Sequence, residues 1–320
     1  MTWRRRLHDD FPGVDIRDDE PLRRHTSFHI GGPAAAMVAV RNERELAAVV
    51  RWCAAIGVRV EILGRGTNVL VSDQGLPGVV LRMTSELADV TPLGETITAG
   101  GGALLDRIVD AAEASGLVGA EFLAGIPGTL GGGLRTNAGA FGHSLAELIE
   151  SVEVIDRQGG AFVLTDNECR EAGGGRLSAQ QEWRLTNQYR SPVVPTELIV
   201  VRAVLRLRKG KPEPARVLRE NRWRKHPSEP SAGSFFKNPA SEPAGRLIER
   251  CGLKGLCAGG ACVSEKHANF IVNRGDARFG DVYELAEVVK ATVEEMTGVL
   301  LEEEVRILPG LERVADSQGR

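Results

Sequence analysis

Residues 125–142, GIPGTLGGGLRTNAGAFG, contain seven glycines in eighteen positions, whereas the whole chain has 38 glycines in 320 residues. Glycine at this density is costly, because each glycine loses more backbone freedom on folding than any other residue. We therefore expect a ligand to approach this backbone closely. A pyrophosphate fits best, with backbone N–H groups and a helix N-terminus near residues 131–135 as its partners. A plain flexible loop is the alternative interpretation.

Strand-like and helix-like patterns alternate on both sides of this loop. Strand patterns cover residues 36–40, 58–63, 78–82, 96–100, 198–208, 268–273, 299–308 and a hairpin at 151–165, and helical periodicity covers 43–57, 103–116, a segment ending near 225, 243–252 and 280–298. This alternation predicts an α+β or α/β fold. Residues 171–183 are polar and glycine-rich, which predicts a surface excursion or a disordered insert, and 209–214 read as a linker.

Length, charge and cysteine content narrow the class of protein. A chain of 320 residues predicts two or three domains with ample core. Its 40 basic and 43 acidic residues give a net charge of −3, which favours neither a nucleic-acid nor an anionic-membrane surface. The longest apolar runs fall far short of the ~20 residues that span a bilayer. We expect a cytosolic protein acting on small molecules, with its five cysteines reduced and packed rather than in disulfides or a zinc site.

A second loop, LGRGTNVLVSD (63–73), leaves a strand and turns through Gly64 and Gly66. It lacks the third glycine and the following helix of a dinucleotide fingerprint, and it lacks the lysine of a phosphate-binding P-loop. What remains is a run of unhindered backbone amides that could bind an anion. A tight turn and an anion site are equally favoured here.

Acidic residues cluster near the C-terminus in LEEEVR (301–306). If this segment is a strand, Glu302, Glu304 and Arg306 share one face, because alternate side chains of a strand do so. A carboxylate beside a like charge has a raised pKa and one beside an arginine has a lowered pKa, so such a face is tunable for proton chemistry. A solvated edge strand is the ordinary alternative.

Eight segments occur in a fixed order along the chain. They are HTSFHIGGPA (25–34), ILGRGTNVLVSDQGLPGVVLR (62–82), the glycine-rich loop, YR (189–190), AGSFFKNP (232–239), AGRLIERCGLKGL (244–256), VSEKHANFIVN (263–273) and LEEEVRIL (301–308). Together they resemble the UDP-N-acetylenolpyruvoylglucosamine reductase (MurB) family, the FAD enzymes of peptidoglycan precursor synthesis. The resemblance runs from about His25 to Leu308.

The resemblance implies an α+β protein with a p-cresol methylhydroxylase-type FAD-binding fold of two α/β subdomains and a C-terminal α+β substrate domain. We expect the following parts: an N-terminal arm (1–24), FAD-binding subdomain 1 (25–83), FAD-binding subdomain 2 (84–208, with a polar insert at about 171–186), a substrate-binding domain (211–310) and a tail (311–320).

Non-covalent FAD and NADPH, the hydride donor, are the cofactors that the resemblance implies, with no metal. The matched loops would hold the FAD pyrophosphate. Their residues are Gly64, Arg65, Gly66, Thr67, Asn68, Gly125, Ile126, Pro127, Gly128, Thr129, Gly132, Asn137, Gly139 and Ala140.

The reaction implied is reduction of UDP-N-acetylglucosamine enolpyruvate to UDP-N-acetylmuramate, with hydride passing from FAD N5 to C3. Ser234 matches the serine that protonates C2, while Arg190 and Glu304 match groups that polarise the substrate carboxylate. Contacts to the phosphate or sugar portions would come from Lys225, Asn238, His267 and Arg306. The expected partner is this small sugar nucleotide, with no nucleic acid and no membrane, and the protein is expected to be a monomer.

Three departures distinguish this chain from the usual family pattern. NPASEPAG (238–245) leaves no room for the extra segment that covers the uridine in one type of the family, so the chain resembles the shorter type. YRSP (189–192) replaces the more usual YR-x-S, and Arg65 stands where a third glycine is common. Two other hypotheses are another oxidoreductase of the same flavin fold, acting on an alcohol or sugar, and a flavin-fold protein that only binds ligand.

Overall fold

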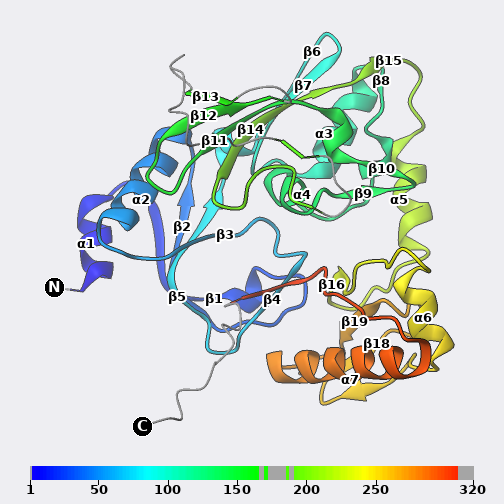
Figure 1. Ribbon diagram of the computed structural model, residues 1–320. Coiled ribbons are helices and arrows are strands. Elements are labelled where there is room, and N and C mark those ends of the chain that lie inside the picture. The colour runs from blue at the N-terminus through cyan, green and yellow to red at the C-terminus, as the bar shows by residue number, and fades with distance from the viewer. Residues whose placement is uncertain (1, 166–168, 172–184, 187–190, 309–320) are drawn as a thin grey trace. The chain divides into compact units, whose positions relative to one another are not determined.

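The computed structural model describes residues 2–165, 169–171, 185–186 and 191–308 (Figure 1). The chain divides into two compact units, each built from segments that are far apart in the sequence. The first comprises Met1–Asp18, Ala36–Arg65 and Gly78–Arg224, and the second comprises Asp19–Ala35, Gly66–Pro77 and Lys225–Arg320.

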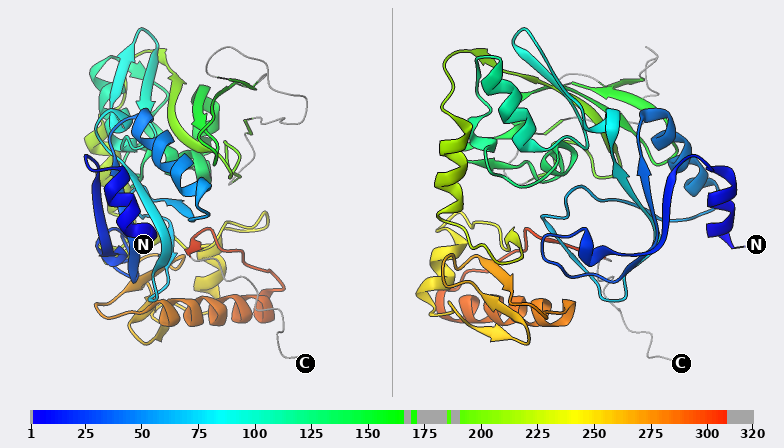
Figure 2. Two further views of the ribbon diagram at one scale, coloured as in Figure 1. Left: turned by 90° about the vertical axis from the view of Figure 1, so that its left-hand side faces the viewer. Right: turned by 180° about the vertical axis from the view of Figure 1, so that it is seen from behind.

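The first unit contains most of a four-stranded sheet of order β1-β2-β5-β3. The elements of this part are α1 (Trp3–Asp10), β1 (Asp15–Pro21), β2 (Pro33–Val40), α2 (Glu43–Ala55), β3 (Val60–Ile62), β5 (Leu76–Met83) and η2 (Ser85–Ala88), while η1 (Leu22–Arg24) belongs to the second unit. Helix α2 begins where the Asn42 side chain accepts the N–H of Glu45 at 2.9 Å, which is a standard N-cap. Its apolar face, with Leu46, Val49 and Val50, packs with β2 and β5 in one core (Figure 2).

A six-stranded antiparallel sheet of order β13-β12-β11-β14-β7-β6 forms the rest of this unit. Its strands are β6 (Val90–Leu93), β7 (Thr96–Gly100), β11 (Ile149–Ile155), β12 (Ala161–Leu164), β13 (Cys169–Glu171) and β14 (Ile199–Arg206). The helices are α3 (Leu105–Ala114), η3 (Glu121–Leu123), α4 (Leu130–Thr136), η4 (Leu145–Leu148) and α5 (Ala215–Trp223), and two short ribbons pair β8 (Leu117–Val118) with β15 (Arg208–Lys209) and β9 (Gly139–Ala140) with β10 (His143–Ser144). Buried residues of α3, α4, β11 and β14 make a second core.

The second unit is organised around a four-stranded sheet of order β16-β19-β18-β17. Its elements are β4 (Val69–Val71), β16 (Ser231–Ser234), α6 (Ala244–Arg250), β17 (Cys257–Ala258), β18 (Ala261–Val263), β19 (Phe270–Asn273), α7 (Phe279–Thr297) and β20 (Arg306–Leu308). Helix α7 packs against β17 and β18 with Val282, Leu285 and Val289 buried (Figure 1). Strand β20 pairs in parallel with β4, so the C-terminal strand is joined to the segment that follows Gly66.

Most of the predicted elements are confirmed, but the predicted strand at 299–308 is mostly wrong. Only Arg306–Leu308 form a strand. Upstream of it, Glu303 makes only an isolated bridge with Phe236, and the carbonyl oxygen of Phe235 accepts the N–H groups of both Glu304 and Val305, so no regular ladder forms there. The prediction also missed α1 and β1 in the N-terminal arm.

The prediction of five reduced cysteines is wrong for two of them, because Cys257 and Cys262 form a disulfide. They are directly opposite one another on the hairpin of β17 and β18, with their Cα atoms 4.1 Å apart. Among the described residues Cys53 is a buried free cysteine and Cys251 is a partly exposed one.

Neither a membrane span nor a metal cluster is found in the part of the chain that the structure describes. None of its helices combines the length and the apolarity needed to cross a bilayer. No three His, Cys, Asp or Glu side chains gather there as ligands for a metal ion. The predicted insert lies almost wholly outside the described residues.

Candidate active site

Ser234 lies at the end of β16, where the register of that strand against β19 shifts. Ser231 is opposite Val272 and Ser234 is opposite Phe270, so three positions on β16 face two on β19. Gly233, inside this irregularity, has a φ of +78°, a backbone conformation that favours glycine. The glycine before Ser234 therefore has a local reason: it makes the turn that presents the hydroxyl.

Asn269 fixes the backbone immediately after Ser234. Its Oδ1 accepts the N–H of Phe236 at 2.9 Å, its Nδ2 donates to the carbonyl oxygen of Phe236 at 2.8 Å, and its own carbonyl oxygen accepts the N–H of Phe235 at 2.7 Å. Asn269 is only 3% exposed, so these bonds are shielded from water. Sequence reasoning missed this residue, although an asparagine next to the apolar run FIV was a visible signal.

The two phenylalanines after Ser234 are almost fully buried in the core of the second unit. The rings of Phe235 and Phe236 meet edge to face, with centroids 5.1 Å apart. Ser234 is thus held by a buried aromatic anchor on its C-terminal side.

Glu304 lies on a segment that bonds directly to this turn. Its backbone N–H donates to the carbonyl oxygen of Phe235 at 2.8 Å. The side chain of Asn68 donates to the carbonyl oxygen of Glu304 at 3.0 Å, and the N–H of Arg306 donates to the carbonyl oxygen of Asn68 at 3.0 Å. One network in the second unit therefore connects the segments that carry Ser234, Glu304 and Asn68.

The expected shared face of Glu302, Glu304 and Arg306 is not formed, because residues 302–305 are outside any strand. Glu302 lies 3.1 Å from Lys237, and Glu303 lies 2.7 Å from Lys290. The carbonyl oxygen of Phe235 accepts both Glu304 N–H and Val305 N–H, the latter at 3.4 Å, which interrupts the strand alternation. The neighbouring carboxylates are thus directed to separate lysines.

Arg190 lies outside the described residues, and so does Tyr189. The described residues around that gap are tied to the first unit: the N–H of Thr186 donates to the carbonyl oxygen of Val193 at 3.0 Å, and the N–H of Val193 donates to that of Leu134 at 2.8 Å. The described residues on both sides of the gap therefore lie next to α4, which is part of the glycine-rich segment.

The first glycine loop has two crowded positions. A Cβ atom at Gly64 would collide with Oγ1 of Thr129, so in the first unit the backbone of the first glycine loop lies against a side chain of the second. In the second unit, Gly66 has a φ of +63°, and a Cβ atom there would collide with the carbonyl oxygen of His25. At Gly66 both the positive φ and the close backbone of His25 favour glycine, whereas at Gly64 the crowding comes from the Thr129 side chain.

Within the second glycine loop, the N-terminus of α4 already has acceptors inside the protein. The N–H groups of Leu130 and Gly131 each donate at 2.8 Å, to Ala103 and Gly101, and that of Gly132 donates to Thr129 Oγ1 at 3.4 Å. The helix expected near residues 131–135 is present, but its first amides serve the fold. Asn137 ends it with a φ of +46°, and its Oδ1 accepts the N–H of Ala146 at 3.1 Å.

Arg222 is a cation beside this loop that sequence reasoning missed. Its Nε donates to the carbonyl oxygen of Ala124 at 2.8 Å and its Nη2 to that of Phe122 at 2.9 Å. The guanidinium lies 5.7 Å from the ring of Phe141, an aromatic side chain that is 76% exposed. Burial lowers the pKa of Arg222 and Asp106 opposes this shift, yet no described carboxylate lies within ion-pair distance of it.

Of the four predicted substrate contacts, His267 has the most defined surroundings. It packs against Phe270 with ring centroids 4.8 Å apart, and its Nδ1 accepts the N–H of Asn269 at 3.3 Å. Burial lowers the pKa of His267, and the charge of Lys254 lowers it further. A neutral imidazole with an acceptor Nδ1 carries its proton on Nε2, which makes Nε2–H a donor for a ligand oxygen.

The other three predicted contacts are exposed: Lys225, Asn238 and Arg306. Asn238 Oδ1 accepts the N–H of Ala244 at 3.0 Å, which supports the start of α6 and leaves the amide N–H₂ of Asn238 as its donor end. Arg306 begins β20. All four residues belong to the second unit.

Comparison with known proteins gives one consistent result. A family model described as UDP-N-acetylenolpyruvoylglucosamine reductase, C-terminal domain, matches residues 225–308, and one described as FAD binding domain matches residues 34–165. The chain is 42% identical over 302 residues to UDP-N-acetylenolpyruvoylglucosamine reductase 2 of Symbiobacterium thermophilum, which covers 91% of this chain and 92% of the relative. It is 40% identical to the reductase of Caldanaerobacter subterraneus subsp. tengcongensis, with 91% and 92% covered.

Among solved structures, the crystal structure of UDP-N-acetylenolpyruvylglucosamine reductase (MurB) from Thermus caldophilus superposes with a TM-score of 0.75. It is 35% identical in sequence, and the match covers 92% of this chain and 99% of that one. These matches confirm the predicted α+β flavin-binding fold with its C-terminal substrate domain. They also support the reductase interpretation over the two other hypotheses.

Proposed function

The chain belongs to the UDP-N-acetylenolpyruvoylglucosamine reductase family, and from this membership we propose how its own residues carry the reaction. It is an NADPH-dependent flavoenzyme that reduces UDP-N-acetylglucosamine enolpyruvate to UDP-N-acetylmuramate in peptidoglycan precursor synthesis. When bound, FAD takes a hydride from NADPH and supplies it to C3 of the enolpyruvyl group.

The two glycine loops fit an anionic dinucleotide. Gly64 and Gly66 lie too close to Thr129 and His25 to carry a side chain, and an amide without a neighbouring side chain is unshielded toward an anion. Arg222 supplies a cation without a carboxylate partner among the described residues. We assign FAD binding to the first loop with Gly64, Arg65, Gly66, Thr67 and Asn68, and to the second with Gly125, Ile126, Pro127, Gly128, Thr129, Gly132, Asn137, Gly139 and Ala140. Because the first amides of α4 are already bonded, we assign the pyrophosphate mainly to the loop amides and to Arg222.

Ser234 is the proposed proton donor to C2 of the substrate. A serine hydroxyl is a weak acid, so it has to be held within ~3 Å of a strongly basic centre to give up its proton. The hydrogen bonds of Asn269 and the buried Phe235–Phe236 pair hold the turn that carries it. This rigid support of one small hydroxyl is the observation that carries the assignment.

Glu304 and Arg190 are the proposed groups at the substrate carboxylate, where negative charge develops as the hydride arrives. Arg190 would meet that charge with its fixed fork of N–H donors, and Glu304 would donate a hydrogen bond in its protonated form. The 2.8 Å bond from Glu304 N–H to the carbonyl oxygen of Phe235 supports a position for Glu304 near the Ser234 turn.

Lys225, Asn238, His267 and Arg306 are the proposed contacts to the diphosphate and sugar of the substrate. His267 would bind as a neutral donor through Nε2, while Lys225 and Arg306 would supply charge. As NPASEPAG leaves no room for an extra uridine-covering segment, the chain is assigned to the shorter type of the family.

The proposal also covers the binding partners, the cellular compartment and the domain boundaries. The substrate is a small sugar nucleotide, and we propose a monomer in the cytoplasm that binds neither nucleic acid nor membrane. For the domains we keep the predicted boundaries of 25–83, 84–208 and 211–310, with the arm and tail outside them.

A steady-state assay with the purified protein tests the proposed function. NADPH consumption should depend on UDP-N-acetylglucosamine enolpyruvate, and the protein should carry a flavin absorption spectrum. NADPH consumption at the same rate without the enolpyruvyl substrate would contradict the assignment.

A further inference from the structure

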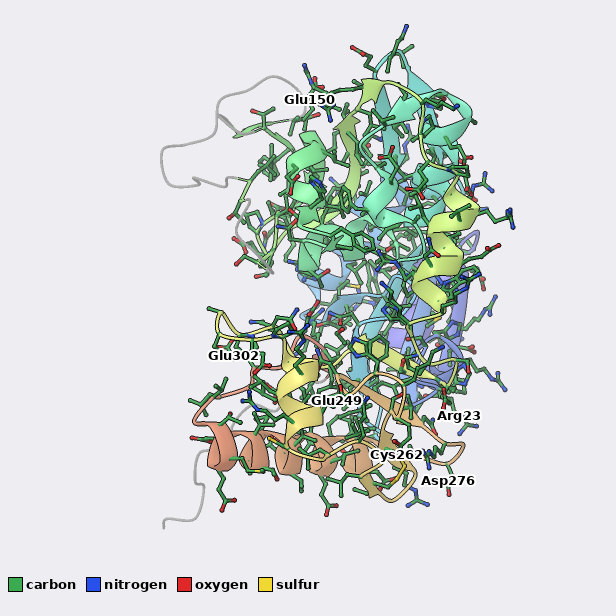
Figure 3. All side chains as sticks on the ribbon, turned by 90° about the vertical axis from the view of Figure 1, so that its right-hand side faces the viewer. Arg23, Glu150, Glu249, Cys262, Asp276 and Glu302 are labelled. Atoms are coloured by element: carbon green, nitrogen blue, oxygen red, sulfur yellow. A yellow bond between two sulfur atoms is a disulfide. The ribbon has the colours of Figure 1, made fainter. Side chains whose placement is uncertain are left out.

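The disulfide Cys257–Cys262 closes a two-residue hairpin in the second unit. Strand β17 reaches Ala258, the turn is Gly259-Gly260, and β18 begins at Ala261. Gly259 has a φ of +51°, as such a tight turn requires. Figure 3 labels Cys262 on β18, with Asp276 close by.

The two sulfur-bearing residues differ in exposure. Cys257 is exposed on the edge strand β17, whereas Cys262 is only 3% exposed on the inner strand β18. Cys257 is therefore the more accessible of the two cysteines to a thiolate from solvent, and access decides which sulfur of a disulfide is attacked.

Both ends of the hairpin are held by bonds that do not involve sulfur. At the tip, Asp281 Oδ2 accepts the N–H of Gly260 at 3.2 Å, and the carbonyl oxygen of Gly260 accepts the N–H of Arg274 at 3.0 Å. At the open end, the N–H of Gly255 donates to the carbonyl oxygen of Val263 at 3.0 Å, and the N–H of Val263 donates to the carbonyl oxygen of Leu256 at 2.8 Å. The S–S bond closes a very short loop, and the entropic stabilisation from a disulfide is smaller for a shorter loop. The hairpin should therefore stay folded when the disulfide is reduced.

Strand β18 leads directly to the turn that carries His267. Val263 pairs with Ile271 on β19, and Ser264 N–H donates to the carbonyl oxygen of Phe270 at 2.8 Å. A Cβ atom at Gly255 would collide with the carboxylate of Glu265, so the hairpin base is in contact with that turn. These contacts connect the base of the hairpin to the turn that carries a proposed substrate contact.

We propose that Cys257–Cys262 is a reversible thiol–disulfide exchange site, entered at Cys257, whose state alters the binding of the sugar nucleotide through the His267 turn. The part concerning substrate rests on the proposed function. The exchange partner is a low-molecular-weight thiol and its disulfide.

The exchange balances as two displacements. A thiolate RS⁻ attacks Sγ of Cys257, the S–S bond breaks, and Cys262 leaves as a thiolate that takes up a proton. A second RS⁻ attacks the R sulfur of the mixed disulfide on Cys257, releasing RSSR and the thiolate of Cys257, which is protonated. Two RSH are oxidised to RSSR while the two cysteines are reduced, and the reverse reaction with RSSR restores the disulfide.

Alkylation of the folded holoenzyme with iodoacetamide tests the exchange. The enzyme is equilibrated in buffers rich in reduced or in oxidised glutathione, and labelled peptides are quantified by mass spectrometry. Cys257 should be labelled in the reduced buffer and protected in the oxidised one, while buried Cys53 and Cys262 stay unlabelled in both. Equal labelling of Cys257 in the two buffers would overturn the proposal.

Two variants sharpen this test. In Cys262→Ser, Cys257 has no intramolecular partner, so the oxidised buffer should leave one glutathione on it. In Cys251→Ser, the redox shift at Cys257 should match that of the wild type. A glutathione adduct on Cys251 in place of Cys257 in the first variant would contradict Cys257 as the point of entry.

Kinetics test the coupling to substrate. The KM for the enolpyruvyl substrate should differ about 5-fold or more between the two redox states, a usual size for coupling between sites, while flavin reduction by NADPH is unchanged. Cys262→Ser should remove the difference. His267→Ala separates the possible failures. If His267→Ala leaves KM unchanged, the proposed substrate contact fails. If His267→Ala raises KM but KM of the wild type is the same in the two redox states, the coupling fails.

Discussion

Asn269 and Phe236 bond to each other twice: the asparagine side chain accepts the N–H of Phe236 at 2.9 Å and donates to its carbonyl oxygen at 2.8 Å. The side chain of Asn269 thus bonds the backbone of Phe236 as a neighbouring strand would, just beyond the end of β16. This bond pair lies two residues from the hydroxyl of Ser234, so it restricts where the turn carrying that hydroxyl can lie.

Asn269→Ala should therefore lower both stability and turnover. Each buried backbone group left without a partner costs about 1–3 kcal/mol, and Phe236 loses two such partners, so the free energy of unfolding should fall by about 2–6 kcal/mol in chemical denaturation. Turnover should fall further than flavin reduction by NADPH does. Asn221→Ala, at an exposed position on α5, is the control and should change neither. An Asn269 variant with wild-type turnover would refute the positioning role.

Gly66→Ala should lose bound FAD, and Gly94→Ala should not. The two glycines have nearly the same φ, +63° and +62°, so both variants carry similar backbone strain. They differ in space, because a Cβ atom at Gly66 would collide with the carbonyl oxygen of His25 and one at Gly94 meets nothing within 4 Å. We expect FAD affinity at least about tenfold weaker only in Gly66→Ala, measured by flavin fluorescence on titration. Equal FAD affinity in the two variants would argue against the crowded loop as the cofactor cradle.

Arg222→Gln should weaken FAD binding by about 10- to 100-fold, a loss of about 1.4–3 kcal/mol in binding free energy. The side chain is the cation beside the second glycine loop, and a partly buried guanidinium with no ion-pair partner among the described residues favours a nearby anion. Arg216→Gln on the same helix is the matched control, since Arg216 is 80% exposed and pairs with Glu220 at 2.8 Å. Isothermal titration of the apoenzyme with FAD measures both, and equal affinities would exclude Arg222 from the site.

His267 should make stability fall in mild acid. Burial lowers the pKa of His267 below its ordinary value of 6.5, so the unfolded chain binds more protons between the lowered pKa and 6.5. Stability therefore rises with pH across that window, and it is lost as the pH falls below about 6.5. The melting temperature of the wild type should drop more between pH 7.5 and 5.5 than that of His267→Gln, which cannot be protonated. Parallel drops in the two proteins would mean that His267 is not buried in its neutral form.

Local pattern was enough to predict the regular elements. Strand β7 (Thr96–Gly100) and helix α7 (Phe279–Thr297) match the ranges expected from alternation and helical periodicity within one or two residues. Both signals are local, because they depend on which side chains the element itself buries. The family motifs similarly predicted the flavin fold and the reductase activity, which the comparisons confirm.

Long-range pairing explains the failures. Residues 299–308 were predicted to be one strand, but the carbonyl oxygen of Phe235, far away in sequence, accepts the N–H groups of both Glu304 and Val305 and breaks the alternation. The disulfide was missed because the prediction looked only for a CxxC pair. Two cysteines symmetrically placed around Gly259-Gly260 were a readable hairpin signal. Arg222 and Asn269 were missed because their roles depend on backbone groups of distant segments.

The most direct test of the proposed chemistry separates the two half-reactions of Ser234→Ala by stopped-flow absorbance. Flavin reduction by NADPH should keep its wild-type rate, while oxidation of the reduced enzyme by the enolpyruvyl substrate should slow by about 10²–10⁴, the usual contribution of a positioned acid. A variant that loses both half-reactions equally, or neither, would contradict Ser234 as the proton donor to C2.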